Sequence, residues 1–438
     1  MSDPEGAGRE GRCMYDLLAR PMAIAALALV LLNVSATAGQ ARDVSVSQRY
    51  GQSCRGVVDG FPVLVLRGTH RERGEAHGFL AAREIIETCN AMATTVNAMG
   101  GNADAPSGWE SAKRLVDRFA FPSRFETELE GMLDGIHKAL PEARDRQLKA
   151  TGAEITLDDL KVLQCGDTLE LMRCSQFSAW GSLTPDGSTI IGRNWDYPPI
   201  FPHDTYCAFA VDPAEPELHK TLDALWFGMI GAGMACLNEE SVYVSGNDGG
   251  SEDPSLVSSP TPGALALRMV GETVSASDPL APVESIIDQK TALALLYHIV
   301  APAAQGNGAR AFAFEHAPGD TTAFEERIRR PSSALPNALI ITNDPLIGGG
   351  AGAEVCERYA RIEAALADPA AKGSVDVEKA RSILDAVAAS GPGTTTQYSA
   401  VVLPGKREMH VATGSAPGKS ATKERYSLLQ WEAVFGLE

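Results

Sequence analysis

The stretch from residue 174 to residue 197 constrains the fold of this chain more than any other segment. Two runs of residues typical of strands, 175–180 and 189–192, flank the sequence Thr-Pro-Asp-Gly at 184–187. Proline and Asp-Gly at these places favour a tight reversal, so the stretch predicts an antiparallel hairpin. Antiparallel pairing returns the end of the second strand to the start of the first.

The residues at the open end of this hairpin are suited to chemistry. Cys174 begins the first strand, and Arg193 and Asp196 follow the second. A thiol beside a cation and a carboxylate is a setting in which cysteine becomes a nucleophile. No histidine lies within the stretch to act as a base. A cut before Cys174 would free an α-amino group with a reference pKa of about 7.7–8.0, which could serve instead.

The N-terminus has the pattern of a secretory signal. Basic residues between 9 and 20 precede an apolar run at 22–32, and the small residues Ala36-Thr37-Ala38 follow. The run is too short to span a hydrocarbon core of about 30 Å comfortably. We therefore expect residues 1–38 to be a signal peptide and the mature protein to be periplasmic or secreted. An uncleaved membrane anchor is the alternative interpretation.

Export changes the interpretation of the eight cysteines. Cys13 would leave with the signal, and an odd number would remain in an oxidising compartment. One thiol would then be reserved for chemistry, while the others allow three disulfides whose pairing stays open. No Cys-x-x-Cys pair or histidine cluster accompanies them, so we expect no metal site. The glycine-rich run 348–352 lacks the Lys-Ser/Thr of a phosphate loop, so we expect no cofactor.

The composition places the chain among globular proteins that do not bind nucleic acid. Hydrophobic residues make up 44% and charged residues 21%, both ordinary for a folded chain. The formal net charge of −18 leaves no basic footprint for phosphates and disfavours anionic membranes. We therefore expect a small-molecule partner, no nucleic acid and no stable membrane insertion.

Periodicity and turn signals predict a helix-rich first part and a mixed second part. Residues 39–57 are polar and expected to be flexible, 100–106 to be a loop, and a strand is expected at 61–68. Helices are expected at 73–99, twice within 110–147, and at 156–171, 263–274, 283–299, 354–366 and 377–389. Further strands are expected at 206–211, 224–228, 241–245, 311–315, 338–342, 399–403 and 408–413. This order favours an α+β layered fold over alternating βαβ units.

These residues together resemble a known family. A cysteine opening a hairpin that closes with Gly-Arg-Asn-x-Asp, here 192–196, is similar to the N-terminal-nucleophile (Ntn) cysteine hydrolases of the isopenicillin N acyltransferase-like group. Acid ceramidase and the choloylglycine (bile-salt) and penicillin V amidases are more distantly similar. Residues 66–78 resemble the strand-turn-helix of the family's pro-segment, and 238–247 resemble its Asn-Glu-x-Gly strand. Residues 341–343 with 357–359 resemble its Thr-Asn-His and later arginine elements, so the resemblance covers roughly 60–415.

The resemblance implies a fold and a processing step. The fold would be a four-layer αββα Ntn-hydrolase sandwich. The chain would be a zymogen cut between Arg173 and Cys174, giving a helix-rich pro-segment or α-subunit (39–173) and a β-subunit (174–438) that form a heterodimer. An exported amidohydrolase or acyltransferase would then cleave or transfer the acyl group of a C–N amide through a Cys174 thioester.

The resemblance also implies roles for six residues. Cys174 would be the nucleophile and its amine the base, Asp196 would hold that amine, Arg193 would favour the thiolate, Asn343 with Asn247 would donate to the oxyanion, and Arg358 would stabilise charge near by. Three departures from the family pattern stand out. Ser241 and Asp344 replace the usual glycine and histidine, which bears on substrate preference, and Arg173 precedes the nucleophile, which bears on self-cleavage.

Two other interpretations stay open at this point. Arg173 before the cysteine also suits an uncleaved, inactive relative that binds an acylated ligand. A ceramidase-like or phospholipase-like lipid hydrolase is a third interpretation, ranked lower because no basic amphipathic membrane face is evident. The acyl and amine groups of a substrate depend on loops that the sequence does not position.

Overall fold

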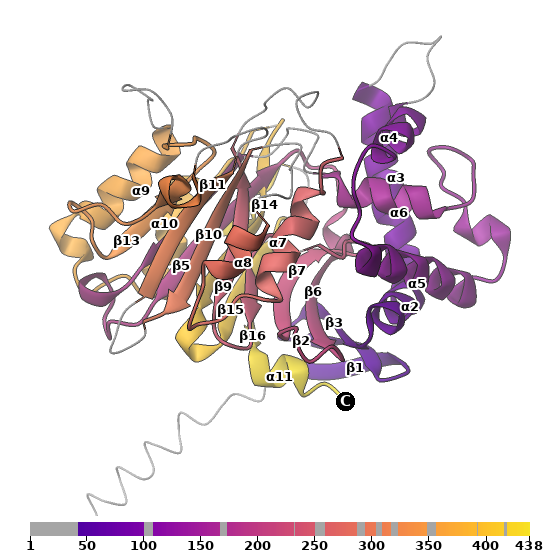
Figure 1. The fold of residues 1–438 in the computed structure, drawn as a ribbon, viewed down its shortest axis with the longest axis horizontal. Coiled ribbons are helices and arrows are strands. Elements are labelled where there is room, and N and C mark those ends of the chain that lie inside the picture. Colours follow the sequence, from indigo (N-terminus) through magenta and orange to yellow (C-terminus); the bar gives the residue numbers. More distant parts are fainter. Residues whose placement is uncertain are drawn as a thin grey trace, which may run out of the picture. The chain divides into compact units, whose positions relative to one another are not determined.

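Two sheets, one of ten strands and one of six, form the centre of the fold (Figure 1). The computed structural model describes residues 43–438 except 100–107, 167–172, 232, 250–258, 287–293, 304–308, 317–322, 348–355, 392 and 416–417. The larger sheet has the order β1-β2-β3-β6-β7-β8-β9-β10-β11-β12, and the smaller has the order β13-β4-β5-β14-β15-β16.

The strands are β1 Val44–Tyr50, β2 Ser53–Val58, β3 Phe61–Gly68, β4 Arg173–Ala179, β5 Ile190–Tyr197, β6 Tyr206–Pro213, β7 Thr221–Trp226, β8 Cys236–Asn238, β9 Tyr243–Asp248, β10 Leu295–Pro302, β11 Ala309–His316, β12 Ile328–Arg329, β13 Ala338–Ile341, β14 Thr395–Leu403, β15 Glu408–Thr413 and β16 Ser427–Gln430. The α-helices are α2 His70–Leu80, α3 Ala82–Met99, α4 Gly108–Val116, α5 Ser123–Ala139, α6 Leu157–Gln164, α7 Gly263–Gly271, α8 Ala281–Ser285, α9 Glu357–Ala367, α10 Val377–Ala386 and α11 Trp431–Phe435.

The two sheets pack face to face between helical layers. Along β4, Phe177 packs outward in a cluster with α9 and α10, whereas Gln176 points the other way and donates a hydrogen bond to Asn247 of β9. On the far side of the larger sheet, Tyr297 of β10 packs in a cluster with α7 and α8. This alternation arises because successive strand side chains point to opposite faces. The predicted α+β class and four-layer αββα arrangement are confirmed.

Helices α2 to α6 form a region beside the edge of the larger sheet (Figure 1). Within it, α2 and α5 approach to backbone contact because glycines line their interface. A Cβ on Gly78 would lie 1.9 Å from the carbonyl oxygen of Met132, and one on Gly135 would lie 2.1 Å from that of Glu75. Any larger residue at either glycine would force these helices apart.

The residues before the Arg173–Cys174 bond pair and pack with the residues after it. Strand β3 pairs in parallel with β6. The buried Glu128 of α5 accepts hydrogen bonds from both Nη atoms of Arg268 on α7, at 3.0 and 2.9 Å, and lies 2.7 Å from the His70 ring of α2. Residues 44–438 therefore form a single unit.

Two predictions of local structure are wrong. Residues 39–57 are not flexible where the structure describes them, because 44–50 and 53–58 form β1 and β2 at the sheet edge. The helix predicted at 283–299 is also wrong, because 281–285 alone is helical there among the described residues and 295–302 is β10. That strand is buried on both faces, and its sequence Leu-Leu-Tyr-His-Ile-Val-Ala-Pro shows no alternation of apolar and polar residues with a period of two.

Other predicted elements are found with shifted boundaries. The helix predicted at 73–99 is two helices, α2 and α3, separated by Ala81 with φ of −135°. The helix predicted at 156–171 begins with the expected cap, a capping box between Thr156 and Asp159, but ends at Gln164. The hairpin β4–β5 is confirmed, and its second strand runs on to Tyr197. The predicted signal peptide and the loop at 100–106 lie outside the described residues.

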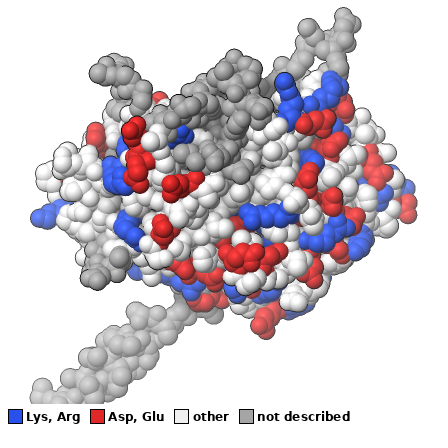
Figure 2. All heavy atoms as spheres, in the orientation of Figure 1, with Lys and Arg blue, Asp and Glu red and all other residues white. Residues whose placement is uncertain are grey.

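Three further features of the fold are the state of the cysteines, the charges on the surface and the apolar character of the helices. Every cysteine in the described part of the chain is a free thiol, so the disulfides that the sequence allowed are not formed there. Acidic and basic side chains lie interspersed over the face drawn in Figure 2. None of the helices in the described ranges has the length and apolar character needed to cross a bilayer.

Candidate active site

Cys174 is the second residue of β4 and is fully buried. Its backbone N–H donates a hydrogen bond to Oδ1 of Asn343 at 2.6 Å, and its carbonyl oxygen accepts one from Arg358. Burial raises the pKa of the thiol to about 11, with the charge of Arg193 opposing the shift. The sulfur is therefore protonated near neutral pH, and its attack on a carbonyl needs a base.

Arg193 directs its guanidinium at this sulfur. It pairs with Gln176 across the hairpin, so both side chains face the larger sheet. Its Nη2 donates to Sγ of Cys174 at 3.8 Å and to the carbonyl oxygen of Gly246 at 2.8 Å, and its Nη1 donates to Oδ1 of Asn247 at 2.5 Å. Three acceptors around a planar, rigid donor group fix its direction. The hairpin thus brings Arg193 beside Cys174 as predicted.

Asn343 and Arg358 reach the cysteine from the smaller sheet's edge and its helical layer. Asn343 follows β13, which pairs with β4, and Arg358 is the second residue of α9. Arg358 donates from Nη2 to Oδ1 of Asn343 at 2.9 Å and from Nη1 to the hydroxyl of Ser175 at 2.9 Å. Because Oδ1 of Asn343 receives two N–H donors, the orientation of its amide is unambiguous. Its Nδ2 donates to the carbonyl oxygen of Asp248 at 2.6 Å.

Asp344 fixes the connection between these two elements. Its Oδ2 lies 3.3 Å from the donating hydroxyl of Thr342 and 3.3 Å from the donating backbone nitrogen of Cys356. Cys356 is the N-cap residue of α9. Asp344 therefore ties the turn carrying Asn343 to the start of the helix that carries Arg358.

Asp196 is fully buried on β5. Its Oδ1 accepts a hydrogen bond from the hydroxyl of Thr396 at 2.5 Å. Its Oδ2 receives no hydrogen bond from the described residues and lies 3.8 Å from Nη1 of Arg358. Burial raises the pKa of this carboxyl to about 6, while Thr396 and Arg358 oppose the shift. A buried carboxylate oxygen without a donor is costly, so a new donor at this place would be stabilising.

Asn247 of β9 completes the group of six, all of which the structure brings together. Its Oδ1 accepts from Arg193 and also from Nε2 of Gln176 at 3.0 Å. Its Nδ2 donates to the carbonyl oxygens of Thr342 at 2.8 Å and Ile341 at 3.3 Å. Both amide hydrogens are thus engaged with the backbone leading to Asn343. This geometry suits holding that backbone better than the expected donation to an oxyanion.

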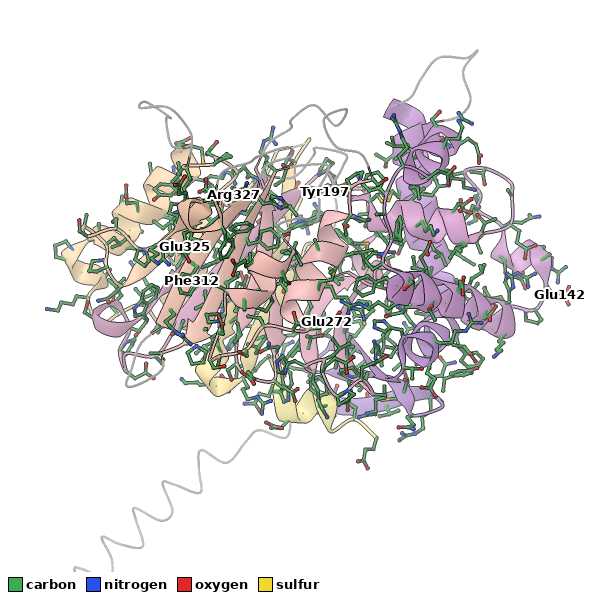
Figure 3. The ribbon with its side chains drawn as sticks, in the orientation of Figure 1. Glu142, Tyr197, Glu272, Phe312, Glu325 and Arg327 are labelled. Atoms are coloured by element: carbon green, nitrogen blue, oxygen red, sulfur yellow. The ribbon has the colours of Figure 1, made fainter. Side chains whose placement is uncertain are left out.

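An apolar cavity opens beside these residues, with about 640 Å³ of empty space that includes some open solvent. Its polar side chains include Arg193 and Asn247, and its walls are otherwise apolar, with aromatic, methionine and leucine side chains. The wall includes Met92, Trp195, Tyr197, Phe201, Trp226, Met229 and Met234. Figure 3 shows Tyr197 at the upper end of the strand layers, far from Glu142 at the outer end of the helical region. Because Met92 lies on α3, both predicted subunits contribute to the cavity.

Several neighbouring residues were not singled out from sequence. Gln176, His298 and Thr396 are buried and hydrogen-bonded to the group or to one another. A polar side chain within a strand buried on both faces needs partners, and this signal could have marked Gln176 and His298. Over the described ranges, no group of three or more acidic, histidine or cysteine side chains is arranged to hold a metal ion.

The comparisons with known proteins bear on the fold only weakly. No family model matches the sequence, and no significantly similar curated protein is found. Solved structures similar to this chain include two variants of conjugated bile acid hydrolase from Clostridium perfringens. They are 14% and 13% identical, with TM-scores of 0.34 and 0.36, and each match covers 60% of this chain and 95% of the other.

Penicillin V acylase from Agrobacterium tumefaciens is also similar, with 13% identity, a TM-score of 0.33, and coverage of 56% of this chain and 84% of the other. Bile-salt and penicillin V amidases are the groups that the sequence resemblance named. TM-scores below 0.5 carry no argument about this chain, so the case for its chemistry rests on the geometry of the six residues.

Proposed function

We propose that this chain is a cysteine amidohydrolase or acyltransferase of the N-terminal-nucleophile kind, with Cys174 as the nucleophile. One observation carries the proposal: the buried sulfur of Cys174 lies 3.8 Å from a guanidinium, while the nitrogen of the same residue is held 2.6 Å from Asn343. No histidine of the described chain is hydrogen-bonded to the sulfur. A nucleophile whose own nitrogen is positioned suits a mechanism in which that nitrogen is the base.

Release of this nitrogen requires a cut between Arg173 and Cys174. The residues after the bond, Cys174 to Ala179, are buried and paired with β5, and those from Gln176 onward are also paired with β13. Arg173 itself is exposed, but an external protease would have to unpair the buried strand that follows it, which favours an intramolecular cut. The sulfur would attack the carbonyl carbon of Arg173, the C–N bond would break, and water would hydrolyse the resulting thioester. The products are a chain ending in a carboxylate and a chain beginning with the amine of Cys174.

Asp196 supports both stages of this scheme. In the uncut chain its carboxylate is the acidic group beside the thiol, and its charge acts to raise the thiol pKa. We propose that it accepts the thiol proton during self-cleavage. After the cut, the free Oδ2 would accept a hydrogen bond from the new amine, which provides the donor that this buried oxygen lacks.

The catalytic cycle follows from the same groups. The amine would take the thiol proton, the sulfur would attack an amide carbonyl, and the amine would return the proton to the leaving nitrogen as the C–N bond breaks. Water would then add to the thioester, and cleavage of the C–S bond would release the acid and restore the thiol. An acceptor amine in place of water would give transfer. The Arg193 guanidinium would favour the thiolate, and an Nδ2 hydrogen of Asn343 would stabilise the oxyanion.

The cavity beside Cys174 supports a bulky apolar acyl group as the part of the substrate that is bound. Its walls include aromatic, methionine and leucine side chains, and its polar side chains include Arg193, which lies beside the sulfur. Methionine and aromatic walls adapt to irregular apolar ligands. The acyl carbonyl would then sit beside Cys174 and the amine portion would face outward. Export through the predicted signal peptide and retention of both chains as a heterodimer are parts of the same proposal.

Intact mass and N-terminal sequencing of freshly purified, reduced and denatured protein test the processing step. We expect two chains, one beginning at Cys174, and a single uncut chain in the Cys174→Ala variant. The same variant should lose all cleavage of N-acyl amides. Amide cleavage retained by Cys174→Ala would reject the assignment of the nucleophile.

A binding function without turnover is the second candidate, favoured by one observation. In the uncut chain Cys174 is fully buried and its thiol pKa is raised to about 11, a state in which the sulfur is inert near neutral pH. Stoichiometric binding of an N-acyl amide by an uncut chain, without release of product, would support this alternative. Comparison of short and long N-acyl amides separates a small-amide hydrolase from a lipid-directed one.

A further inference from the structure

A buried polar network lies between the two sheets and is not used in the chemistry above. Gln176 of β4 and His298 of β10 are each fully buried. The Oε1 of Gln176 lies 3.1 Å from Nδ1 of His298, and Nε2 of His298 lies 3.1 Å from the hydroxyl of Ser178. The hydroxyl of Tyr243 donates to the same Oε1 at 3.4 Å. Polar groups in such a place are retained at a cost in desolvation, so their hydrogen bonds need an explanation.

The direction of each hydrogen bond in this network follows from the donors and acceptors present. Oδ1 of Asn247 is an acceptor, so Gln176 presents its Nε2 to Asn247 and its Oε1 to His298. Burial lowers the pKa of His298 to about 3, with the charges of Arg329 and Arg193 adding to the effect, so its ring is neutral. The ring therefore carries its proton on Nδ1, and its Nε2 accepts from Ser178.

Asn247 connects this network to the candidate active site, so the orientation of its amide depends on that of Gln176. Its Oδ1 is shared between Nε2 of Gln176 and Nη1 of Arg193, and its Nδ2 holds the carbonyl oxygen of Thr342. If the amide of Gln176 turned over, its oxygen would face Oδ1 of Asn247, and the two acceptors would repel. Asn247 would then have to turn as well, which would place its NH2 group against the guanidinium of Arg193.

We propose that His298 and Gln176 are positioning residues that set the orientation of Asn247 and, through it, direct Arg193 at the sulfur of Cys174. The inference rests on the proposed function, because it assigns these residues to the geometry of that reaction. Neither residue touches the sulfur or the cavity as described, so neither is a catalytic residue. The chain of hydrogen bonds runs from one sheet to the other, and therefore also fixes the spacing of β4, β9 and β10 at the site.

The experiment compares His298→Leu with His298→Asn. An asparagine places its Nδ2 close to where Nδ1 of histidine lies, so it retains the donor to Gln176, whereas leucine removes it. The pH dependence of iodoacetamide labelling at Cys174 in the protein as purified, followed by mass spectrometry of its peptide, reports the thiol pKa directly. We expect His298→Leu to raise that pKa by about one unit and to lower kcat about tenfold with KM little changed. His298→Asn should restore both values towards those of the wild type.

A matched control removes buried hydrogen bonds that are remote from Asn247. Ser399→Ala deletes a hydroxyl that lies 2.8 Å from Asn194 and 2.6 Å from Tyr426, on the other face of the smaller sheet. It should lower Tm without moving the thiol pKa. If His298→Leu behaves in the same way, the network is only structural and the proposal is overturned.

Nitrogen-15 spectra of the histidine rings measure which ring nitrogen of His298 carries the proton. This measurement needs neither a folded variant nor substrate turnover. We expect His298 in the wild-type protein as a neutral ring with the proton on Nδ1 and no titration between about pH 5 and 9. A proton on Nε2 would overturn the proposal. Because labelling and ring state are measured without substrate, they remain informative if the protein cleaves no amide, whereas the proposed function is tested by amide cleavage and its loss in Cys174→Ala.

Discussion

The backbone nitrogen of Cys174 donates a hydrogen bond to Oδ1 of Asn343 at 2.6 Å. This contact holds the atom that would become the catalytic base before the chain is cut. The same oxygen accepts from Arg358, so the Asn343 amide keeps its Nδ2 on the opposite side, where it donates to Asp248. One side chain is therefore placed to serve two steps, with its oxygen on the amine and its nitrogen available to an oxyanion.

Asn343→Asp separates these two roles. The carboxylate retains an acceptor for the nitrogen of Cys174 but has no N–H for the oxyanion. We expect amide cleavage by the processed enzyme to fall about 10²–10³-fold in kcat, the usual loss when one oxyanion donor is removed. Steady-state kinetics on chains matched for processing measure the effect.

Asn337→Asp is the control for this substitution. Asn337 donates to the hydroxyl of Ser182 at 2.7 Å, outside the candidate site, and the same change of amide to carboxylate there should leave kcat within about twofold. A similar loss in both variants would point to the added negative charge rather than to the missing donor.

Asp196→Asn should change how stability depends on pH. Burial raises the folded-state pKa of Asp196 to about 6, above the ordinary value of 3.8 for an aspartate. The folded chain thus binds more protons than the unfolded chain between these values, so the contribution of Asp196 is greatest at low pH and declines as pH rises through this window. The decline is about 3 kcal/mol at most. Asparagine does not titrate, so it removes the decline.

Urea unfolding of Cys174→Ala and of Cys174→Ala with Asp196→Asn, from pH 4 to pH 7, measures this difference on chains that stay in one piece. The unfolding free energy of the single variant should drop relative to that of the double variant as pH rises. A constant difference across the range would show that Asp196 titrates at an ordinary pKa.

The candidate site could be predicted from sequence because its first three members lie on one hairpin. A turn between two strands fixes which residues return beside Cys174, and this relation needs only local pairing rules. Asn247, Asn343 and Arg358 were assigned through the family resemblance, since residues 70 or more positions away are brought near by strand order that local rules do not give.

The parts that were missed have separate physical causes. Strand β10 is buried on both faces, and its run Leu295–Val300 has no polar alternation to distinguish it from a helix. Strands β1 and β2 look polar because β1 lies exposed at a sheet edge. Gln176 and His298 meet because β4 and β10 face each other across the two sheets. The two residues are 122 positions apart in the sequence, and no local periodicity relates them.

Ser241→Gly should stabilise the chain. Ser241 has a φ of 62°, which lies in the left-handed region that favours glycine. The turn is otherwise well formed, since Oδ1 of Asn238 accepts from the backbone nitrogens of Glu240 and Val242. Glycine removes the steric cost of this conformation, less its own loss of entropy, for a gain of about 0.5–1 kcal/mol.

Thermal unfolding of Ser241→Gly and Ser241→Ala in the Cys174→Ala background tests this explanation. Alanine retains a Cβ and should give no gain. Equal stabilisation by alanine and glycine would mean that the serine hydroxyl, and not the backbone conformation, is unfavourable at this position.

Phe201→Ala should change selectivity rather than the chemical step. Phe201 lines the cavity and packs on Trp226 with ring centroids 4.4 Å apart, but it makes no contact with Cys174 in the described structure. Removing its ring takes apolar surface away from a bound acyl group. We expect KM for N-acyl amides with a bulky acyl group to rise about tenfold with kcat little changed, because the lost contact is made equally in the ground and transition states.

The acetyl analogue of the same amine is the critical comparison, because an acetyl group does not reach the aromatic wall if the carbonyl sits beside Cys174. Its kcat/KM should be unchanged in Phe201→Ala. Phe435→Ala, which removes a ring packed at a tilt against Trp431 and not among the residues that line the cavity, should affect neither substrate. Equal losses for the bulky and acetyl substrates would place the acyl group elsewhere, and the cavity would then have to hold the amine portion, which reverses the direction in which the substrate crosses Cys174.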